Sequence, residues 1–252
     1  MTLKNMIKLG FVFALVWTVG LNSAQAVSAT VGDDFNDGIP NATLWSVPSW
    51  SSAKVKENSG RLRFFSNPNY TNDPLWQLGE WDTSFIRKYN GADSLNIYGK
   101  VRVPHMIASD PGGPVVNDYE IGLGLVANTN WNYVELTVRD SQSNRQFGVF
   151  YFKDSSHREY TSYPAPTNIS IFNLRLRYMS ATDRLDFFWA EAGSSTWTKI
   201  GPGYTMGDLF GGPKTKRMFP YVTAYTENVM VMPGWNVWLD NFSAVYIDKP
   251  LP

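Results

Sequence analysis

Trp235-Asn-Val-Trp-Leu-Asp-Asn-Phe-Ser-Ala-Val-Tyr-Ile247, close to the end of the chain, is the stretch that decides the fold. If it is a β-strand, its side chains point alternately to two faces, and both faces are apolar. One face holds Val237, Leu239, Val245 and Ile247, and the other holds Trp238, Phe242, Ala244 and Tyr246. A strand that is apolar on both faces is covered on both sides, so the sequence predicts a central strand and not an edge strand.

Asp240 lies in the middle of this strand. A carboxylate in such a place is tolerated only with a cation or several hydrogen-bond donors around it, so a partner is expected. The segment around Asp33-Asp34-Phe35, near the start of the chain, is also strand-like. We expect the internal last strand to pair close to this first one, which is how many all-β sandwiches close.

Residues 1–26 have the order of a secretory signal peptide. Lys4 and Lys8 precede an uncharged apolar run over residues 9–21, and Ala24-Gln25-Ala26 gives the small-x-small pattern that signal peptidase recognises. The run is shorter than the roughly 20 residues of a membrane-spanning helix. We therefore expect a secreted or periplasmic protein with no membrane attachment after cleavage, and a single domain over residues 27–252.

The composition excludes several kinds of chemistry. The chain has no Cys, which excludes disulfides, thiolate zinc sites and cysteine nucleophiles. It has 22 Lys and Arg residues against 22 Asp and Glu residues. Nucleic acid is therefore not an expected partner, because phosphate binding needs a clear basic excess. The 10 Trp, 13 Tyr and 15 Phe residues are more rings than a core of this size usually hides completely.

Short alternating runs separated by Gly, Pro, Asn and Asp recur from residue 32 onward, and no stretch has apolar residues at helical spacing. One turn is expected at Asn58-Ser-Gly60, and two hairpins at residues 180–183 and 192–195. The expected strands cover residues 61–65, 95–103, 119–127, 133–140, 146–153, 172–178, 185–191, 196–200 and 218–225. This pattern predicts an all-β fold, a two-layer antiparallel sandwich.

The segment 172–201, the opening Asp33-Asp34-Phe-Asn-Asp-Gly38 and the closing Trp238-Leu-Asp-Asn-Phe-Ser243 together resemble bacterial exported domains of the concanavalin A-like lectin and glucanase superfamily, LamG-like domains included. The resemblance is one of pattern and order over most of residues 27–252. It implies a jelly roll with one concave sheet, the face on which that superfamily usually holds carbohydrate.

Catalysis by the route of the family-16-type glucanases is not expected. Those enzymes share a strand with the pattern Glu-x-Asp-x-x-Glu, and this chain lacks it. Asp118-Tyr-Glu120 is a partial match, but Leu123 stands where a further acid is needed. Two acids about 5–9 Å apart can also come from neighbouring strands. If the protein is an enzyme, Glu120 and Glu135 are the candidate pair for a hydrolase, and an Arg–Tyr pair is the alternative for a lyase.

Gly122-Leu-Gly124 matches the letters of a dinucleotide-binding fingerprint. That fingerprint needs a turn into a helix, whereas a further strand follows here, so we interpret the match as accidental.

Alternation also predicts which side chains point away from the core, and these are expected to share one sheet face. Such a face has two interpretations. It is a solvated ladder of Arg–Glu pairs, or a groove in which Arg holds sugar hydroxyls or carboxylates while aromatic rings stack on sugars. The candidate ligand-binding residues are Tyr98, Arg102, Trp131, Tyr133, Arg139, Arg175, Arg177 and Tyr221.

The resemblance further implies a structural calcium between the first and last strands, held by Asp33, Asp34 and Asp240 with backbone carbonyls and water. In the alternative, Asp240 accepts hydrogen bonds or pairs with an Arg. The expected function is lectin-like glycan binding on the concave face, with calcium as the one expected cofactor. A polysaccharide-active enzyme and a structural or adhesive envelope protein are the alternatives.

Overall fold

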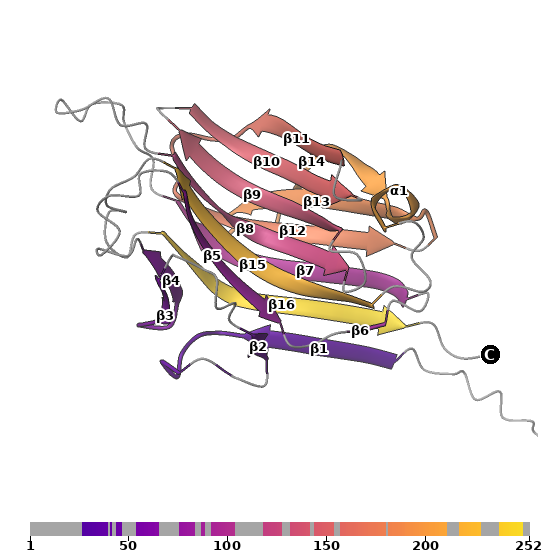
Figure 1. Ribbon diagram of the computed structural model, residues 1–252, viewed down its shortest axis with the longest axis horizontal. Helices are drawn as coiled ribbons and strands as arrows, with labels where there is room; N and C mark the ends of the chain where they lie inside the picture. Colours follow the sequence, from indigo (N-terminus) through magenta and orange to yellow (C-terminus); the bar gives the residue numbers. More distant parts are fainter. Residues whose placement is uncertain are drawn as a thin grey trace, which may run out of the picture.

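A computed structural model describes residues 27–39, 41, 44–46, 54–65, 76–83, 87–88, 92–103, 118–127, 132–141, 144–153, 157–179, 181–210, 217–227 and 237–248. They form two antiparallel sheets of eight strands each (Figure 1). The predicted two-layer all-β sandwich is confirmed. The expected signal peptide, residues 1–26, lies outside the described residues.

The first sheet has the order β14 (Thr198–Thr205), β13 (Arg184–Glu191), β12 (Ile171–Met179), β7 (Ala92–Arg102), β16 (Val237–Asp248), β4 (Leu62–Phe65) and β3 (Lys54–Glu57), with β1 (Val27–Asp33) paired to β16. The second has the order β11 (His157–Pro164), β10 (Asn144–Lys153), β9 (Tyr133–Ser141), β8 (Asp118–Ala127), β15 (Arg217–Glu227), β5 (Trp76–Thr83) and β2 (Trp45–Ser46), with β6 (Arg87–Lys88) paired to β15.

β16 is a central strand, as its apolar pattern predicts. It pairs with β7 on one side and with β4 and β1 on the other. β1 runs antiparallel to it from Val27 opposite Asp248 to Asp33 opposite Phe242 (Figure 1). The expected return of the last strand to the first is therefore confirmed.

A β-bulge divides β16 and changes which residues face the core. The register against β7 shifts between Asp240 and Ser243, and Asn241 has φ of 52°. Because one extra residue reverses the alternation, Phe242, Ala244 and Tyr246 join the same core as Val237 and Leu239. The prediction that Trp238 shares a face with Phe242 is wrong: Trp238 pairs with Arg63 and Arg102 on the outer face of the sheet.

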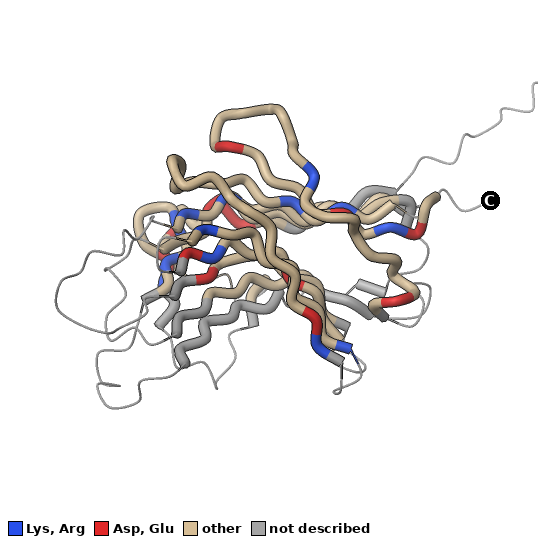
Figure 2. Tube along the Cα trace, turned by 90° about the horizontal axis from the view of Figure 1, so that it is seen from above, with Lys and Arg blue, Asp and Glu red and all other residues tan. Residues whose placement is uncertain are grey.

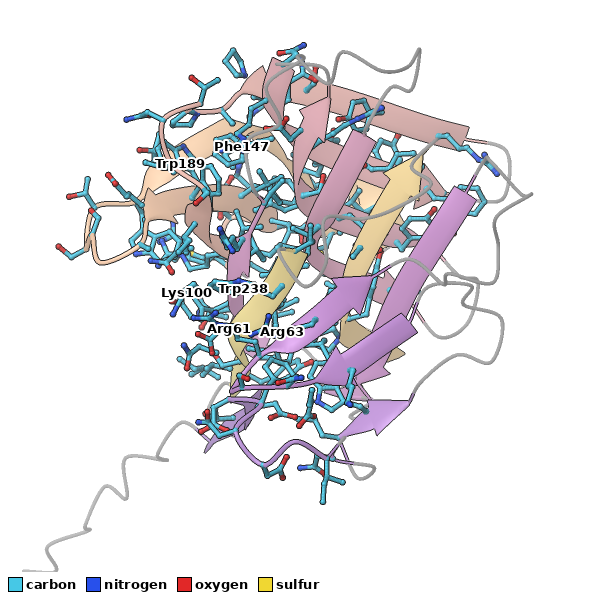
Figure 3. All side chains as sticks on the ribbon, turned by 90° about the vertical axis from the view of Figure 1, so that its left-hand side faces the viewer. Arg61, Arg63, Lys100, Phe147, Trp189 and Trp238 are labelled. Carbon is cyan, nitrogen blue, oxygen red and sulfur yellow. The ribbon has the colours of Figure 1, made fainter. Side chains whose placement is uncertain are left out.

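The core lies between the two sheets and is rich in rings. Phe147 of β10 stacks on Trp189 of β13, with centroids 5.2 Å apart, and meets Phe172 of β12 edge-on at 5.6 Å (Figure 3). Gly99 of β7 leaves room for Leu123 of the opposite sheet, since a methyl group on Gly99 would lie 2.9 Å from it. These contacts fix how the sheets lie on each other.

The expected turns are present and the strand boundaries are close to the predicted ones. Ser59 and Gly60 both have positive φ in the two-residue hairpin between β3 and β4, and Gly193 has φ of 86°. The expected strands did not include β2, β3, β5, β6 and β11, and the short helix α1 (Met206–Phe210) was also missed. No helix in the described part of the chain is long and apolar enough to cross a membrane.

Candidate functional site

The predicted ligand-binding residues lie on two faces, not one. Strands β7 and β12 carry Tyr98, Arg102, Arg175 and Arg177 on the outer face of the first sheet. Strands β8, β9 and β15 carry Glu120, Tyr133, Glu135, Arg139 and Tyr221 on the outer face of the second sheet. The expectation of a single shared face is therefore wrong, because the core separates the two groups. Trp131 lies outside the described residues.

Aromatic side chains form two rows across the outer face of the second sheet. Residues paired directly across antiparallel strands point to the same side, so the strand register defines each row. The first row is Tyr221, Gly124, Glu135, Phe150 and Tyr160. The second contains Val126, Tyr133, Phe152 and Arg158, and the Tyr133 and Phe152 rings stack with centroids 5.4 Å apart.

Glycines on this face lie beneath two tyrosine rings. A methyl group on Gly124 would lie 2.2 Å from the Tyr221 ring, and one on Gly148 would lie 2.9 Å from the Tyr160 ring. Each ring therefore leans over a position where any side chain would displace it. Tyr221 is only 4% exposed, whereas Tyr160 is 39% exposed. Of the two, Tyr160 offers the ring surface, and Tyr221 does not have the accessible ring that its predicted stacking role needs.

Polar groups surround these rings. The Tyr221 hydroxyl donates to Glu135 Oε1 at 2.6 Å, and the Thr137 hydroxyl donates to Glu120 Oε1. The Arg139 guanidinium lies 5.8 Å from the centre of the Tyr160 ring. The face thus combines rings with carboxylates, a hydroxyl and a guanidinium.

The two glutamates are widely spaced along this face. In the strand register, Glu120 of β8 lies directly opposite Arg139 of β9. Arg139 is four residues from Glu135 along β9. Four residues span roughly 13 Å at about 3.4 Å per residue. Their side chains would have to lean toward each other to come within the reach of a hydrolase pair, about 5–9.5 Å.

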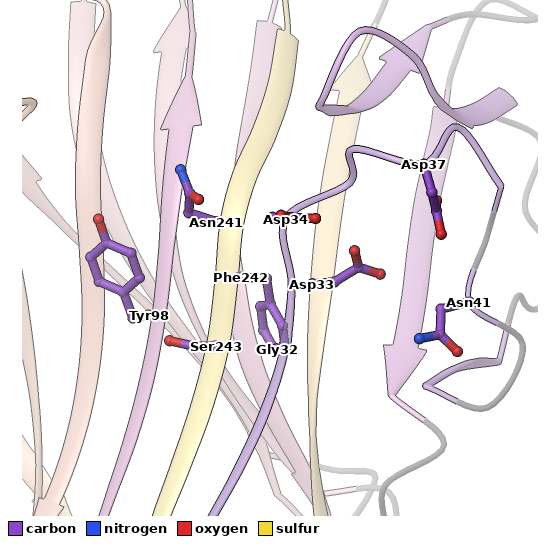
Figure 4. A pocket seen from close by; sticks show the side chains of 9 residues that line it. All are labelled: Gly32, Asp33, Asp34, Asp37, Asn41, Tyr98, Asn241, Phe242 and Ser243. Carbon is purple, nitrogen blue, oxygen red and sulfur yellow. The ribbon is translucent and has the colours of Figure 1, made fainter.

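A polar pocket of about 580 Å³ opens beside the bulge of β16 (Figure 4). It is lined by Gly32, Asp33, Asp34, Asp37, Asn41, Tyr98, Asn241, Phe242 and Ser243. Asp33 is already engaged, because its two oxygens accept hydrogen bonds from the Phe35 backbone at 2.8 Å and from Trp45 Nε1 at 2.6 Å. Asp34 and Asp37 each accept a backbone N–H two residues on.

The expected calcium ligand set of Asp33, Asp34 and Asp240 is not formed. Asp240 pairs with Lys100, with Nζ 2.8 Å from Oδ2, so its partner is a lysine on the neighbouring strand. Among the described residues, no three carboxylate or imidazole groups lie together as a metal site. The alternative in which Asp240 pairs with a basic side chain describes its surroundings correctly, with Lys in place of Arg.

Glu57, which was not among the predicted site residues, is a buried carboxylate in this region. It is 2% exposed, and no donor among the described residues reaches either of its side-chain oxygens. Burial, the adjacent Asp37 carboxyl and the charges of Asp33, Asp37 and Asp34 raise the pKa of Glu57 to about 8. Two carboxylates that face each other need a proton or a cation between them.

Comparison with protein-family models and with curated protein sequences finds no match. Among solved structures, endo-1,3-β-glucanase from Streptomyces sioyaensis matches with a TM-score of 0.59 at 10% identity, covering 88% of this chain and 97% of the glucanase. Winged bean acidic lectin, solved with methyl-α-D-galactose, matches with a TM-score of 0.54 at 11% identity, covering 88% and 100%. The fold is that of the concanavalin A-like lectins and glucanases.

A putative β-glucanase from Mycobacterium abscessus matches as well, with a TM-score of 0.51 at 10% identity, covering 86% of this chain and 98% of that one. At these identities the likeness concerns the concanavalin A-like fold. The matched structures include both a lectin and glucanases.

Proposed function

We propose that the protein binds glycans through the outer face of the second sheet. The observation that carries the proposal is the Tyr160 ring, which leans over Gly148, is 39% exposed and has Arg139 beside it. An exposed ring held against a sheet can stack on the apolar face of a sugar ring, while neighbouring polar groups bind the hydroxyls. A secreted or periplasmic location, after removal of residues 1–26, is part of the same proposal.

Replacing Tyr160 by Ala is expected to weaken glycan binding about three- to tenfold, because ring stacking contributes that much beyond area burial. Isothermal titration with neutral β-1,3-glucan, β-1,4-glucan, xylan and galactoside oligosaccharides measures the effect. The Tyr160→Phe variant keeps the ring and is expected to bind like the wild type. A wild type that binds no glycan, or a Tyr160→Ala variant with unchanged affinity, contradicts the proposal.

Hydrolysis is the second candidate function, and the glutamate geometry does not favour it. We expect the Glu120→Gln and Glu135→Gln variants to keep most of the glycan affinity, and the wild type to release no reducing ends from β-glucans. Steady release by the wild type that is lost in either variant would make the protein an enzyme.

An adhesive role toward another protein has less support, because the exposed large apolar residues in the described part, Ile39, Tyr160 and Met179, are scattered along the chain.

We also propose that a calcium ion lies between Glu57 and Asp37, with backbone carbonyls and water completing its six to eight oxygen ligands. The residues fit this role because Glu57 is buried beside Asp37 with no hydrogen-bond donor from the described residues. Bound calcium would neutralise the two carboxylates and tie the loop after β1 to the hairpin of β3 and β4.

Calcium at about 100 times its Kd is then expected to raise the melting temperature by about 5–10 °C relative to a chelator. The Glu57→Gln variant should lose this response, and the Asp240→Asn variant, whose carboxylate lies at Lys100, should keep it. Equal melting of the wild type with calcium and with chelator would show that a proton neutralises Glu57 instead. In that case the free energy of unfolding would fall as the pH rises from about 4.5 to about 8, because the folded chain holds that proton more tightly.

A further inference from the structure

The outer face of the first sheet is basic, although the whole chain has equal numbers of basic and acidic residues. The register of β3, β4, β16, β7, β12, β13 and β14 places the same-face residues in rows. Among the described residues, the strands of this face carry two acidic side chains, Asp186 and Asp240, and nine basic ones: Lys56, Arg61, Arg63, Lys100, Arg102, Arg175, Arg177, Arg184 and Lys199. Figure 2 colours the basic positions of the trace blue and the acidic positions red.

The two acidic side chains form ion pairs with three of these basic side chains. Asp240 pairs with Lys100 at 2.8 Å, and Asp186 lies 2.8 Å from Lys199 and 3.6 Å from Arg184. Arg177 lies directly opposite Asp186 in the strand register, but the Asp186 carboxylate contacts Lys199 and Arg184 instead. On the strands of this face, the described basic side chains therefore outnumber the acidic ones.

Arg175 and Arg177 are held in place by aromatic rings instead. The Arg175 guanidinium lies 4.3 Å from the centre of the Trp197 ring and 4.8 Å from that of Phe188. Arg177 lies 4.9 Å from the same Phe188 ring. The Trp197 ring also contacts the Tyr98 ring of β7 edge-on, with centroids 6.1 Å apart. This contact helps to hold the Trp197 ring in place.

This arrangement keeps two guanidinium groups close together, and no ion pair to either of them is found among the described residues. The Nε atoms of Arg175 and Arg177 are buried and have no hydrogen-bond partner among the described residues. Burial, and then the charge of Arg177, lower the pKa of Arg175. Like charges held together destabilise the folded chain, and a bound anion would relieve that repulsion.

We propose that this face binds a carboxylated or sulfated polysaccharide, with Arg175 and Arg177 as its anion-binding pair and Trp197 as the ring beside them. Planar guanidinium groups fixed by stacking suit carboxylate and sulfate oxygens, which they can contact through two parallel hydrogen bonds. Further basic residues, Arg61 and Arg63, lie on the same face (Figure 3), so a polymer can contact more of this face than a single small anion can. The choice of a sugar polymer rests on the proposed function.

Binding of polygalacturonate and of dextran sulfate tests the inference, with neutral dextran for comparison. The Arg175→Gln/Arg177→Gln double variant should bind both anionic polymers at least about tenfold more weakly, with a smaller dependence of affinity on salt. Arg175→Lys keeps the charge without the planar fork and should lie between the wild type and the double variant. Lys153→Gln removes a basic residue of β10 in the second sheet, outside both rows of rings, and should bind like the wild type. Thermal melting of each variant checks that it is folded.

Each result separates this inference from the proposed function. Loss of neutral-glycan binding in Tyr160→Ala, together with wild-type binding of both anionic polymers by the double Arg variant, would overturn the inference alone. Anionic binding that depends on Arg175 and Arg177, without any neutral-glycan binding, would support the inference and remove the stacking site on the second sheet. If single-stranded DNA binds more tightly than either polysaccharide and is lost in the same variant, the partner is a nucleic acid and the inference is wrong.

Discussion

Replacing Arg145 by Ala is expected to lower the free energy of unfolding by about 3–5 kcal/mol, because the change removes the cation that faces the buried Asp140 carboxylate. Arg145 of β10 and Asp140 of β9 are directly paired and both have side chains that are 0% exposed. The Arg145 Nε lies 2.7 Å from Asp140 Oδ2. Urea denaturation monitored by tryptophan fluorescence measures the loss.

Arg145 also joins the two sheets. Its Nη1 donates to the carbonyl of Ile169, in the segment before β12, and its Nη2 donates to the carbonyl of Val103 at 3.0 Å, just after β7. The guanidinium lies 5.7 Å from the Phe172 ring. Its removal therefore deprives a buried carbonyl at Val103 and a partly buried one at Ile169 of this donor, and a buried group is costly to leave unsatisfied.

An arginine on the surface serves as the matched control. Arg158→Ala removes an exposed side chain of β11 and is expected to cost no more than about 1 kcal/mol. The Arg145→Met/Asp140→Leu double variant removes both charges and should recover part of the loss, since no buried ion remains. A cost below about 1 kcal/mol for Arg145→Ala would show that the buried pair does not hold the sheets together.

The expectation that both faces of β16 are covered is wrong, because the bulge brings Leu239 and Phe242, from the two predicted faces, into one core. The sequence nevertheless predicted the sandwich and the central position of β16 within it. It could not predict the bulge. The only local sign is Asn241, a residue type that accepts positive φ more readily than most, and many Asn residues in strands do not form bulges. The side to which Trp238 points depends on that single extra residue.

The candidate site was predicted in part. Alternation identified correctly that side chains such as Arg175 and Glu135 point away from the core. It could not assign them to one sheet or the other, because pairing between distant strands is a tertiary property. The burial of Glu57 could have been predicted from the sequence. The two-residue turn at Ser59 and Gly60 sets Glu57 opposite Leu62, which is fully buried, and this register places the carboxylate inside.

Composition also gave an incomplete answer about charge. Equal totals of acidic and basic residues argue against a polyanion only if both kinds are evenly spread. The fold gathers Lys and Arg on the first sheet, whereas on the opposite outer face Arg139 lies directly across from Glu120. The three-dimensional arrangement therefore decides which partners the surface can accept.

Trp238→Ala is expected to cost about 3–5 kcal/mol of unfolding free energy, the usual range for truncating a buried Trp. Trp238 points to the outer face of the first sheet yet is only 1% exposed. The Arg61 guanidinium lies 4.2 Å from its ring centre, and Lys100 Nζ lies 5.9 Å away (Figure 3). The ring thus fills the space between the central strand and the basic side chains above it.

The contribution of Trp238 comes from its ring and not from a hydrogen bond. Its Nε1 has no partner among the described residues, so Trp238→Phe removes volume without breaking a bond and is expected to cost less than about 1.5 kcal/mol. In a double-mutant cycle with Arg61→Ala, the coupling between Arg61 and Trp238 should be about 0.5–2 kcal/mol, as for other cation–π pairs. Equal costs for the Phe and Ala variants would show that the indole N–H, and not ring packing, stabilises this part of β16. In that case a donor–acceptor contact to a neighbouring segment would replace the packing of Arg61 on the ring as the source of the stability.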